Sequence, residues 1–485
     1  SISLKHENNP ERVLEQLAHH YHQGNNKSKA ITHLAKAGKK AKQQYNHQVA
    51  LKLYAQGLEH LGESSVNLLE EQIIIHEGLG DVYAIQGEFD VAIKHFERTE
   101  QITKSVLHEA KIKRKIAGVF EKRSEYETAT EMLQQALEIL KGQPDLIEEA
   151  TIHNSIGWIH SQKGDYTQAI KTAKRALELV EETTAYDIIA SINKNLGNYY
   201  FRKGDLEKTN LYFKNGISQA EQIGDKMLMA QLYNNLGLVA NMTGQVDNAL
   251  NNYEQSIELK KQIGDNVGLT NSYSNLGSLY STMNDFAAAL KCHQQALEIA
   301  QRSGLKESVA NVENSLGNFH FKQGNYDKAI HHYLISLDIR KEIGNLLGLA
   351  EVYINLTGAN LEKGNLETAE KYSHEGLKTA KEISVPQAIA NAWNKVGLVQ
   401  QKKKDWREAL KSFSKAAEIA DKANMTLEIA EANRCTGEVM IEMGNQDQAK
   451  TSLQKALGIY QKIKSTSNIK LTQKLLSKLE EHSPN

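Results

Sequence analysis

Histidine and cysteine are the side chains of this protein best suited to bind a metal or attack a substrate, but their spacing favours neither role. His19, His20 and His22 lie close together, yet the HExxH motif is absent and no cysteine stands near them. Cys292 and Cys435 fall in different repeats of the pattern described below, so a catalytic role for either would need a partner that the spacing does not identify. We therefore expect surface histidines and packed cysteines.

Other motifs that mark enzymes by their spacing are missing from the sequence. It contains neither a GxxxxGK[ST] phosphate loop nor a GxSxG elbow. His153 and His160 are seven residues apart on one expected helix, but His160 takes the repeat position that Tyr83 and Tyr200 occupy elsewhere, which indicates packing. The sequence thus predicts no enzyme activity, no metal and no cofactor in this chain.

Asparagine offers a different chemistry, because it recurs at matching places along the chain. Counted from a small residue that returns about every 40 positions, asparagines stand at minus six, minus three, minus two and plus one, which is one face of a helix. These residues are Asn154, Asn195, Asn198, Asn234, Asn235, Asn271, Asn275, Asn311, Asn314, Asn318, Asn355, Asn391 and Asn394. A row of amides carries donors and acceptors that can pair with the backbone of an extended peptide, so the pattern predicts a peptide-binding or partner-binding groove.

A second interpretation of the same asparagines remains open. Asparagine is a mediocre helix former, so its recurrence inside long helices needs a reason other than local stability. That reason could be hydrogen bonding between neighbouring helices of the array rather than ligand binding. The two interpretations can hold together.

Helix pairs repeated at constant spacing must position these residues. The small residue recurs at Gly80, Ala117, Gly157, Gly197, Gly237, Gly277, Gly317, Thr357, Gly397 and Gly437. Two further mostly small positions follow, twelve and nineteen residues later, as in Ala249 and Ser256. Small side chains let two helices approach closely, while Leu, Ile and Tyr at helical spacing fill the remaining space. Each repeat is predicted to be helix A, turn and helix B, and the repeats must stack to bury their apolar faces.

The turns carry the expected signals for ending one helix and starting the next. Gly204 and Asp205 combine a glycine that can adopt a left-handed conformation with an aspartate that can cap the following helix. Three positions depart from the pattern: Thr357 places a β-branched residue in the small slot, and Asn284 and Lys404 replace the turn glycine. These departures are interpreted either as local changes of superhelical pitch or as tolerated drift.

The pattern resembles the tetratricopeptide repeat (TPR) family. The resemblance rests on Leu79-Gly80, Tyr83, Ala92 and Phe96, and it extends over roughly residues 26 to 462. It implies an all-α, right-handed TPR superhelix, an α-solenoid of about eleven helix pairs with terminal capping helices. A HEAT or armadillo solenoid also has repeats of this length, but the evenly spaced Gly and Ala positions argue against it.

A 40-residue period is similar to that of Pins-type adaptors and kinesin light chain. In those proteins asparagines at the minus-two place hold a peptide backbone, and Asn195, Asn235, Asn275 and Asn355 fall on that place. The family's carboxylate clamp would require a cluster of Lys and Arg on this face, and these residues are too scattered here to form one. The resemblance therefore implies a neutral groove over roughly residues 150 to 400.

The two ends of the chain depart from the regular repeat. We expect an N-terminal helical cap and a degenerate first repeat over residues 1–64, the tandem array over 65–465, and a C-terminal capping helix over 466–485. A helix is predicted from Pro10 to Gln23. The segment that follows resembles the one that joins STAND or AAA-type ATPases to TPR arms in bacterial signalling proteins.

Composition limits the classes of partner and compartment. Lys and Arg number 58 against 59 Asp and Glu, so no broad attraction to nucleic acid or anionic lipid is expected. Two cysteines in 485 residues indicate a reducing compartment, and no stretch has the length and apolarity of a signal peptide or a membrane span. We expect a cytoplasmic protein that binds neither nucleic acid nor membrane.

These observations favour a non-enzymatic protein-interaction scaffold that binds an extended peptide or a partner protein in an Asn-rich concave groove. The alternative hypothesis makes the chain the sensor or regulatory arm of a larger ATPase or nucleotide cyclase, whose catalytic domain would be absent from this sequence. A P-loop domain encoded directly upstream of Ser1 would favour the alternative.

Overall fold

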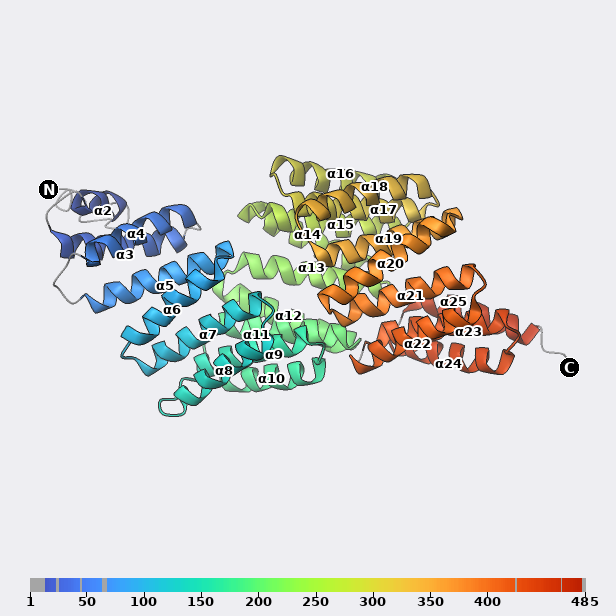
Figure 1. Cartoon of the computed structure of the whole chain (residues 1–485), viewed down its shortest axis with the longest axis horizontal. Coiled ribbons are helices and arrows are strands. Elements are labelled where there is room, and N and C mark those ends of the chain that lie inside the picture. The colour runs from blue at the N-terminus through green and yellow to red at the C-terminus, as the bar shows by residue number, and fades with distance from the viewer. Residues whose placement is uncertain are drawn as a thin grey trace. The chain divides into compact units, whose positions relative to one another are not determined.

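The computed structural model describes residues 14–22, 26–43, 46–62, 68–423, 425–463 and 465–481, and this described part is all helical (Figure 1). Pro10 and Gln23, the expected ends of the first helix, lie outside it. The chain divides into two compact units. Unit 1 comprises the residues up to Ile159 together with Glu178–Glu182, and unit 2 comprises His160–Leu177 and Thr183 onwards.

The helices of unit 1 follow one another as antiparallel pairs. In chain order they are α2 (Leu14–His22), α3 (Lys27–Gln43), α4 (His47–Gly62), α5 (Leu69–Gln86), α6 (Phe89–Ile102), α7 (Val106–Lys122), α8 (Tyr126–Leu140) and α9 (Leu146–Gln162). The last residues of α9 belong to unit 2, and α10 (Tyr166–Val180) is divided between the units.

Unit 2 continues the same alternation to the end of the described chain. Its helices are α11 (Tyr186–Arg202), α12 (Leu206–Ile223), α13 (Lys226–Met242), α14 (Val246–Ile263), α15 (Asn266–Thr282), α16 (Phe286–Arg302), α17 (Lys306–Lys322), α18 (Tyr326–Glu342), α19 (Leu346–Lys363), α20 (Leu366–Ile383), α21 (Pro386–Lys402), α22 (Trp406–Lys422), α23 (Thr426–Glu442), α24 (Gln446–Lys462) and α25 (Thr466–Glu481). Odd-numbered helices from α3 on are the A helices and even-numbered helices from α4 on are the B helices. The prediction of an all-α solenoid is confirmed.

Most helix pairs close around a glycine on helix A and a large side chain sixteen residues later on helix B. A Cβ atom built on Gly237 would lie 2.6 Å from Cε1 of Tyr253, and one on Gly80 would lie 2.6 Å from Cε1 of Phe96. No side chain fits in so small a gap, so the glycine is required by packing. The small slot predicted from the sequence is therefore confirmed.

Thr357 fills the same slot without disrupting its pair. The residue sixteen positions later is Ser373 rather than an aromatic residue, and both side chains are buried. The Thr357 hydroxyl donates a hydrogen bond to the carbonyl of Tyr353, 2.7 Å away, so its polar atom is satisfied. A larger residue on helix A is thus balanced by a smaller one on helix B.

The turns between helices keep one conformation whether or not glycine is present. Gly204 has φ +75°, and Asp205 accepts a hydrogen bond from the Lys208 amide at the start of α12, as predicted. Asn284 and Lys404 adopt φ values of 61° and 64° at the equivalent positions. Because the turn geometry is retained, the structure supports drift rather than a change of pitch at these two sites.

Two B helices carry a buried cation near their ends, and each cation lies beside a glycine eight residues later. Lys260, 3% exposed, donates to the carbonyl of Gly268 and to the hydroxyl of Ser272. A Cβ on Gly348 would lie within 1.9 Å of an Arg340 nitrogen, and Arg340 is also 3% exposed. The glycine makes room for the cation at the junction between repeats.

Buried contacts join the helices at both ends of the described array. Tyr54 of α4 lies against Gly38 of α3, in the arrangement of the regular repeats. At the other end, Leu479 of α25 is buried against Ala449 and Leu453 of α24. Helices α3 and α4 therefore pack as a pair, and α25 packs on α24.

Candidate functional site

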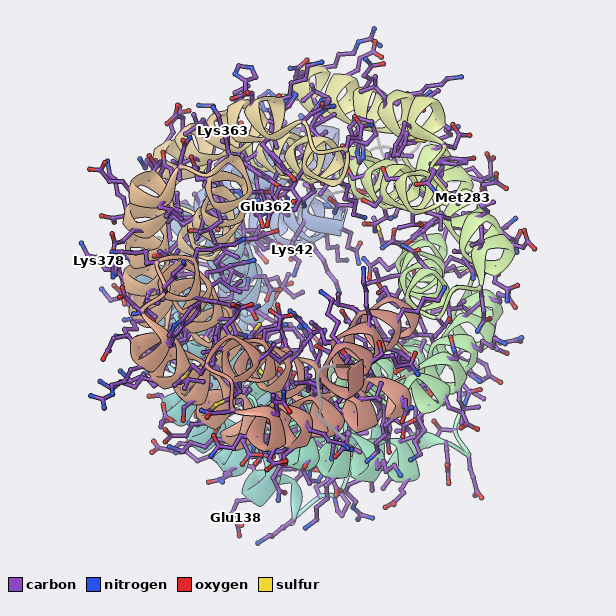
Figure 2. The ribbon with its side chains drawn as sticks, turned by 90° about the vertical axis from the view of Figure 1, so that its right-hand side faces the viewer. Lys42, Glu138, Met283, Glu362, Lys363 and Lys378 are labelled. Atoms are coloured by element: carbon purple, nitrogen blue, oxygen red, sulfur yellow. The ribbon has the colours of Figure 1, made fainter. Side chains whose placement is uncertain are left out.

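The A helices of unit 2 form its inner layer. Each A helix from α13 to α23 packs on the next A helix as well as on its own B helix, and no successive pair of B helices in the described chain packs to this extent. The layer whose members lie closer together is the inner side of a curved stack. In Figure 2, Glu362 near the end of α19 faces inward, whereas Lys378 on α20 projects outward.

The predicted asparagines of unit 2 lie on this inner layer, and two pairs of them join neighbouring helices. Nδ2 of Asn275 on α15 donates to Oδ1 of Asn234 on α13 at 3.1 Å. Nδ2 of Asn355 on α19 donates to Oδ1 of Asn314 on α17 at 2.9 Å. In both pairs the minus-three residue of one repeat meets the minus-two residue of the next. We call such a contact a rung.

A second type of contact joins the plus-one residue of one repeat to the minus-two residue of the next. Nδ2 of Asn235 approaches Oδ1 of Asn198 at 3.5 Å, at the limit for a hydrogen bond. The interpretation of the asparagines as links between A helices is therefore confirmed for these pairs. An amide carries two donor hydrogens and two acceptor lone pairs, so one rung leaves part of its capacity for other partners.

Other members of the predicted set are held by residues of different types. Asn311 accepts a hydrogen bond from Nη2 of the buried Arg340 at 2.9 Å. Asn318, which is exposed, accepts one from the Tyr333 hydroxyl at 2.6 Å. These contacts fix the orientation of two amides on the inner layer.

The remaining predicted residues differ in exposure and in location. Asn271 is exposed, and Asn195 and Asn391 are half-buried on their A helices. Asn154 lies on α9 within unit 1, so the two units divide the predicted set. The structure brings the asparagines from α11 to α21 onto one layer of unit 2.

Asn394 is the exception among the asparagines of the inner layer. It is 2% exposed, and neither Nδ2 nor Oδ1 has a hydrogen-bond partner in the described structure. In the rungs above, the partner stands 41 residues later, and here that position is Cys435, a buried thiol. The rung between α21 and α23 is therefore incomplete.

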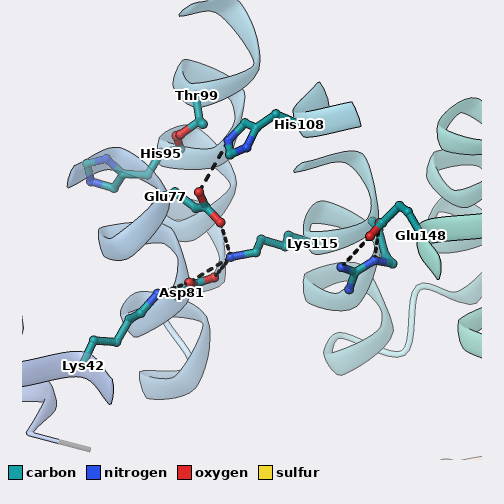
Figure 3. Close-up of polar contacts among 9 residues, drawn as sticks. Lys42, Glu77, Asp81, His95, Thr99, His108, Lys115 and Glu148 are labelled. Atoms are coloured by element: carbon teal, nitrogen blue, oxygen red, sulfur yellow. Dashed lines mark hydrogen bonds and ion pairs between the residues drawn. The ribbon is translucent and has the colours of Figure 1, made fainter. Parts of the chain in front are cut away.

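Unit 1 uses charged residues at the same repeat positions (Figure 3). Nζ of Lys115 on α7 lies 2.7 Å from Oε1 of Glu77 and 2.7 Å from Oδ1 of Asp81, both on α5. Lys42 of α3 and His108 of α7 also contact these carboxylates. Glu77 and Lys115 form a minus-three to minus-two rung, while Asp81 and Lys115 match the relation of Asn198 and Asn235. This network was not predicted from the sequence, although the shared register of the repeat positions could have revealed it.

Burial lowers the pKa of two lysines on or near the inner layer of unit 2. Burial lowers the pKa of Lys194, with Asp225 acting in the opposite direction. Burial also lowers the pKa of Lys260 to about 8, again opposed by an aspartate, Asp265. Lys194 lies on α11 and Lys260 on α14, so the two lysines belong to different repeats.

The cysteines have the properties of packed residues. Both are buried and free of disulfides. Burial raises the pKa of the Cys292 thiol to about 11 and that of Cys435 to about 12, so neither is a thiolate near neutral pH. The described residues hold no group of three or more His, Cys, Asp or Glu side chains arranged to bind a metal. None of the described helices is both long and apolar enough to traverse a lipid bilayer.

Comparison with known proteins identifies the family. The family model described as Tetratricopeptide repeat matches residues 108–182, 187–262, 228–302, 308–382 and 388–462, which is more than half of the chain. The protein therefore belongs to the tetratricopeptide repeat family, whose fold suggests a scaffold for protein–protein interaction. No curated protein matches the sequence.

Several solved structures are similar to this chain at low sequence identity. The apo form of the quorum sensor NprR from B. thuringiensis is similar with a TM-score of 0.53 and 16% identity, over 69% of this chain and 94% of that one. A Rap protein complexed with Competence and Sporulation Factor gives a TM-score of 0.49 and 14% identity, over 74% of this chain and 99% of that one. A STAND protein with a TPR sensor from Pyrococcus horikoshii gives 0.44 and 18%, over 83% of this chain and 55% of that one.

Proposed function

We propose that this protein is a non-enzymatic scaffold that binds an extended peptide segment of a partner protein along the inner layer of unit 2. The amides of the rungs would pair with the N–H and C=O groups of the ligand backbone, so that recognition depends little on the ligand's side chains. The proposal puts the protein in the cytoplasm, since both cysteines are unpaired.

The observation that carries the proposal is the row of hydrogen-bonded amides on neighbouring A helices. Asn235, Asn275 and Asn355 are half-buried, so each still meets solvent while one of its hydrogens is held by a neighbour. Fixing an amide before the ligand arrives lowers the entropy lost on binding. The rung thus acts as a device that orients a recognition group as well as a link between repeats.

Selection of peptides from a random display library tests the proposal and does not require the natural partner to be identified. Peptides that bind the wild-type protein are then tested for their affinity to a variant carrying Asn235→Ala, Asn275→Ala and Asn355→Ala. We expect affinity to fall by about a hundredfold, because three hydrogen bonds each contribute about 1 kcal/mol. Circular dichroism checks that the variant remains helical.

Three exposed asparagines on B helices supply the matched control. Asn215 of α12 and Asn248 and Asn251 of α14 are exposed, and their replacement by alanine removes the same number of amides. This control variant is expected to bind the selected peptides like the wild type. Equal binding by both variants, with helicity intact, would show that the inner layer is not the binding face.

A further inference from the structure

Residues far apart in the sequence meet within unit 2, where its last helices touch its first turns. Nη1 of Arg202, at the end of α11, donates to Oε1 of Gln387 on α21 at 2.7 Å. Nε2 of Gln387 in turn donates to Oε1 of Glu428 on α23 at 2.7 Å, and Glu428 is buried. These polar contacts connect helices that are about five repeats apart.

Apolar contacts join the same two parts of unit 2 at two successive turns. A Cβ built on Gly204 would lie 3.0 Å from Cγ2 and 4.0 Å from Cβ of Ile463. A Cβ built on Gly164 would lie 3.7 Å from Cβ of Ala423. The turns after α9 and α11 therefore face the start of α21 and the turns after α22 and α24. We call this meeting the seam; it comprises Gly164, Arg202 and Gly204 on one side, and Gln387, Ala423, Glu428 and Ile463 on the other.

The seam is packed less completely than the joints between successive helices. Two cavities lie along it, of about 570 Å³ and about 290 Å³. The larger is lined from one side by Tyr200 and Lys203 and from the other by Thr426 and Ile463. Within the array, by contrast, α13 and α12 share a continuous buried core that includes Phe213, Leu232 and Val239. Both cavities are open to solvent, so the side chains that line them lack protein neighbours on one side, and the seam has gained only part of the contact energy of a fixed joint.

We propose that the seam is a reversible intramolecular closure, in which helices α21–α25 dock on the turns after α9 and α11 and can separate from them while the helix pairs stay intact. The specific hydrogen bonds define the closed position of these helices. The incomplete packing keeps the free energy of opening small. A repeat array opens in this manner because each repeat contacts mainly its neighbours, so small rotations at several joints add up.

The closure has a consequence for ligand access that rests on the proposed function. A folded partner that carries the bound segment in the middle of its chain could reach the inner layer only when the seam opens. A closed seam would then hold the ligand once bound. Ligand binding and closure would be coupled to the extent that the ligand favours one of the two states.

Engineered disulfides test the closure directly and need no ligand. The separation of 4.0 Å between the Cβ atoms makes Gly204→Cys with Ile463→Cys suitable for a disulfide. A side chain is tolerated at this left-handed turn, since Ser124, Asn284 and Lys404 adopt the same conformation. Gly164→Cys with Ala423→Cys, at 3.7 Å, provides a second and independent pair.

The matched control places a cysteine at a turn that is remote from the seam. Gly324 has φ +76° and no atom within 4 Å of its built Cβ, so Gly324→Cys with Ile463→Cys carries the same chemistry without the contact. Under mild oxidation we expect both seam pairs to form an intramolecular disulfide in most of the molecules, and the control pair to form almost none. Non-reducing electrophoresis of the monomer gives the readout.

Reversibility has its own readout. The seam pairs should crosslink more slowly when Arg202→Glu is added, by several fold, because the new carboxylate faces Glu428 across the seam. X-ray scattering should show a larger radius of gyration for the reduced protein than for the crosslinked one. Failure of both seam pairs to crosslink in folded protein would overturn the closure. Identical scattering of the reduced and crosslinked forms would overturn its reversibility.

The experiment separates failure of this inference from failure of the proposed function. Selected library peptides fused in the middle of a folded carrier protein should associate about tenfold more slowly with the crosslinked form than with the reduced form. Crosslinking at the seam without any peptide binding would reject the proposed function and keep the closure. Equal association rates would reject the coupling between the closure and ligand access.

Discussion

The two units build the same layer of A helices with different chemistry. In unit 1, Lys115 contacts Glu77 and Asp81 as charged groups. In unit 2, several of the equivalent positions are occupied by neutral amides, as in the rung of Asn234 and Asn275. The repeat positions are the same, so the difference lies in the side chains alone.

This difference in side chains changes how well the layer can bind a ligand, although both kinds of side chain link neighbouring A helices. The charged groups of a rung form strong hydrogen bonds with each other, and an uncharged ligand cannot replace them with hydrogen bonds of equal strength. An amide rung is weaker and leaves donors and acceptors that match a peptide backbone. Both kinds of rung hold neighbouring A helices together, but the amide layer is the better surface for an uncharged extended segment.

The largest predicted effect concerns Lys260, one of two buried cations among the described residues of unit 2. Burial lowers the pKa of Lys260 to about 8 in the folded protein, below its value in the unfolded chain. The unfolded state therefore binds more protons between about pH 8 and pH 10, so stability rises with pH across this window. We expect wild type to gain up to about 3 kcal/mol over Lys260→Met between pH 7 and pH 10.

Urea denaturation of both proteins at the two pH values measures this change. The comparison uses the pH-dependent difference between the two proteins, so titrations that they share cancel. A constant difference between wild type and Lys260→Met across the pH range would contradict the buried, destabilised ammonium group in unit 2.

The charged layer of unit 1 should depend on salt. Lys115→Met leaves two carboxylates facing each other with fewer partners, and we expect a loss of about 1–3 kcal/mol at low salt. Because these side chains are about a quarter exposed, high salt should reduce the loss of stability.

Asn355→Ala in unit 2 removes one amide rung and should cost about 1 kcal/mol of stability at any salt concentration. Thermal unfolding at low and high salt distinguishes the two; the same salt response for both variants would remove the contrast between the units.

Much of the fold followed from local patterns in the sequence. The glycine slot at Gly237, the turn at Gly204 and the final helix containing Leu479 depend on residues within one or two repeats. The face carrying the asparagines was also predictable, because helical spacing decides it. Whether these asparagines bind a peptide stays a prediction.

Other features escaped the sequence analysis for different physical reasons. The rung between Asn314 and Asn355 could have been inferred from the recurrence of the same pair of positions in Asn234 and Asn275. The contact between Lys260 and the glycine eight residues later could likewise have been inferred from the sequence. The seam could not, since it depends on small rotations that accumulate over several repeats, and no local pattern encodes their sum.

The incomplete rung of unit 2 offers a stabilising substitution. Cys435→Asn places an amide of nearly the same volume where Asn394 has no partner. Completing the hydrogen bonds should increase stability by about 1 kcal/mol, because unpaired buried amides are costly. Differential scanning calorimetry measures the change. Cys292→Asn is the control, since Cys292 lies on a B helix outside the rungs, and it should destabilise the protein.

The smallest predicted effect concerns a turn that both units share. Lys404 adopts φ 64°, where a side chain is disfavoured, so Lys404→Gly should stabilise the protein by about 0.5 kcal/mol or slightly more. Ser124→Gly in unit 1 should behave similarly, since its φ is 62°. Melting temperatures provide the comparison, and a loss of stability in either variant would show that the side chain makes an unrecognised contact.

The central claim is that the amide layer of unit 2 recognises a peptide backbone, and chemical modification of a selected ligand tests it most directly. A library peptide that binds unit 2 is prepared in two altered forms, one with N-methyl groups replacing several backbone N–H donors and one with its non-anchoring side chains replaced by alanine. Calorimetric titration should show that N-methylation weakens binding by about tenfold or more, whereas alanine replacement has a smaller effect. Undiminished binding of the N-methylated peptide, with binding lost on side-chain replacement, would contradict the account.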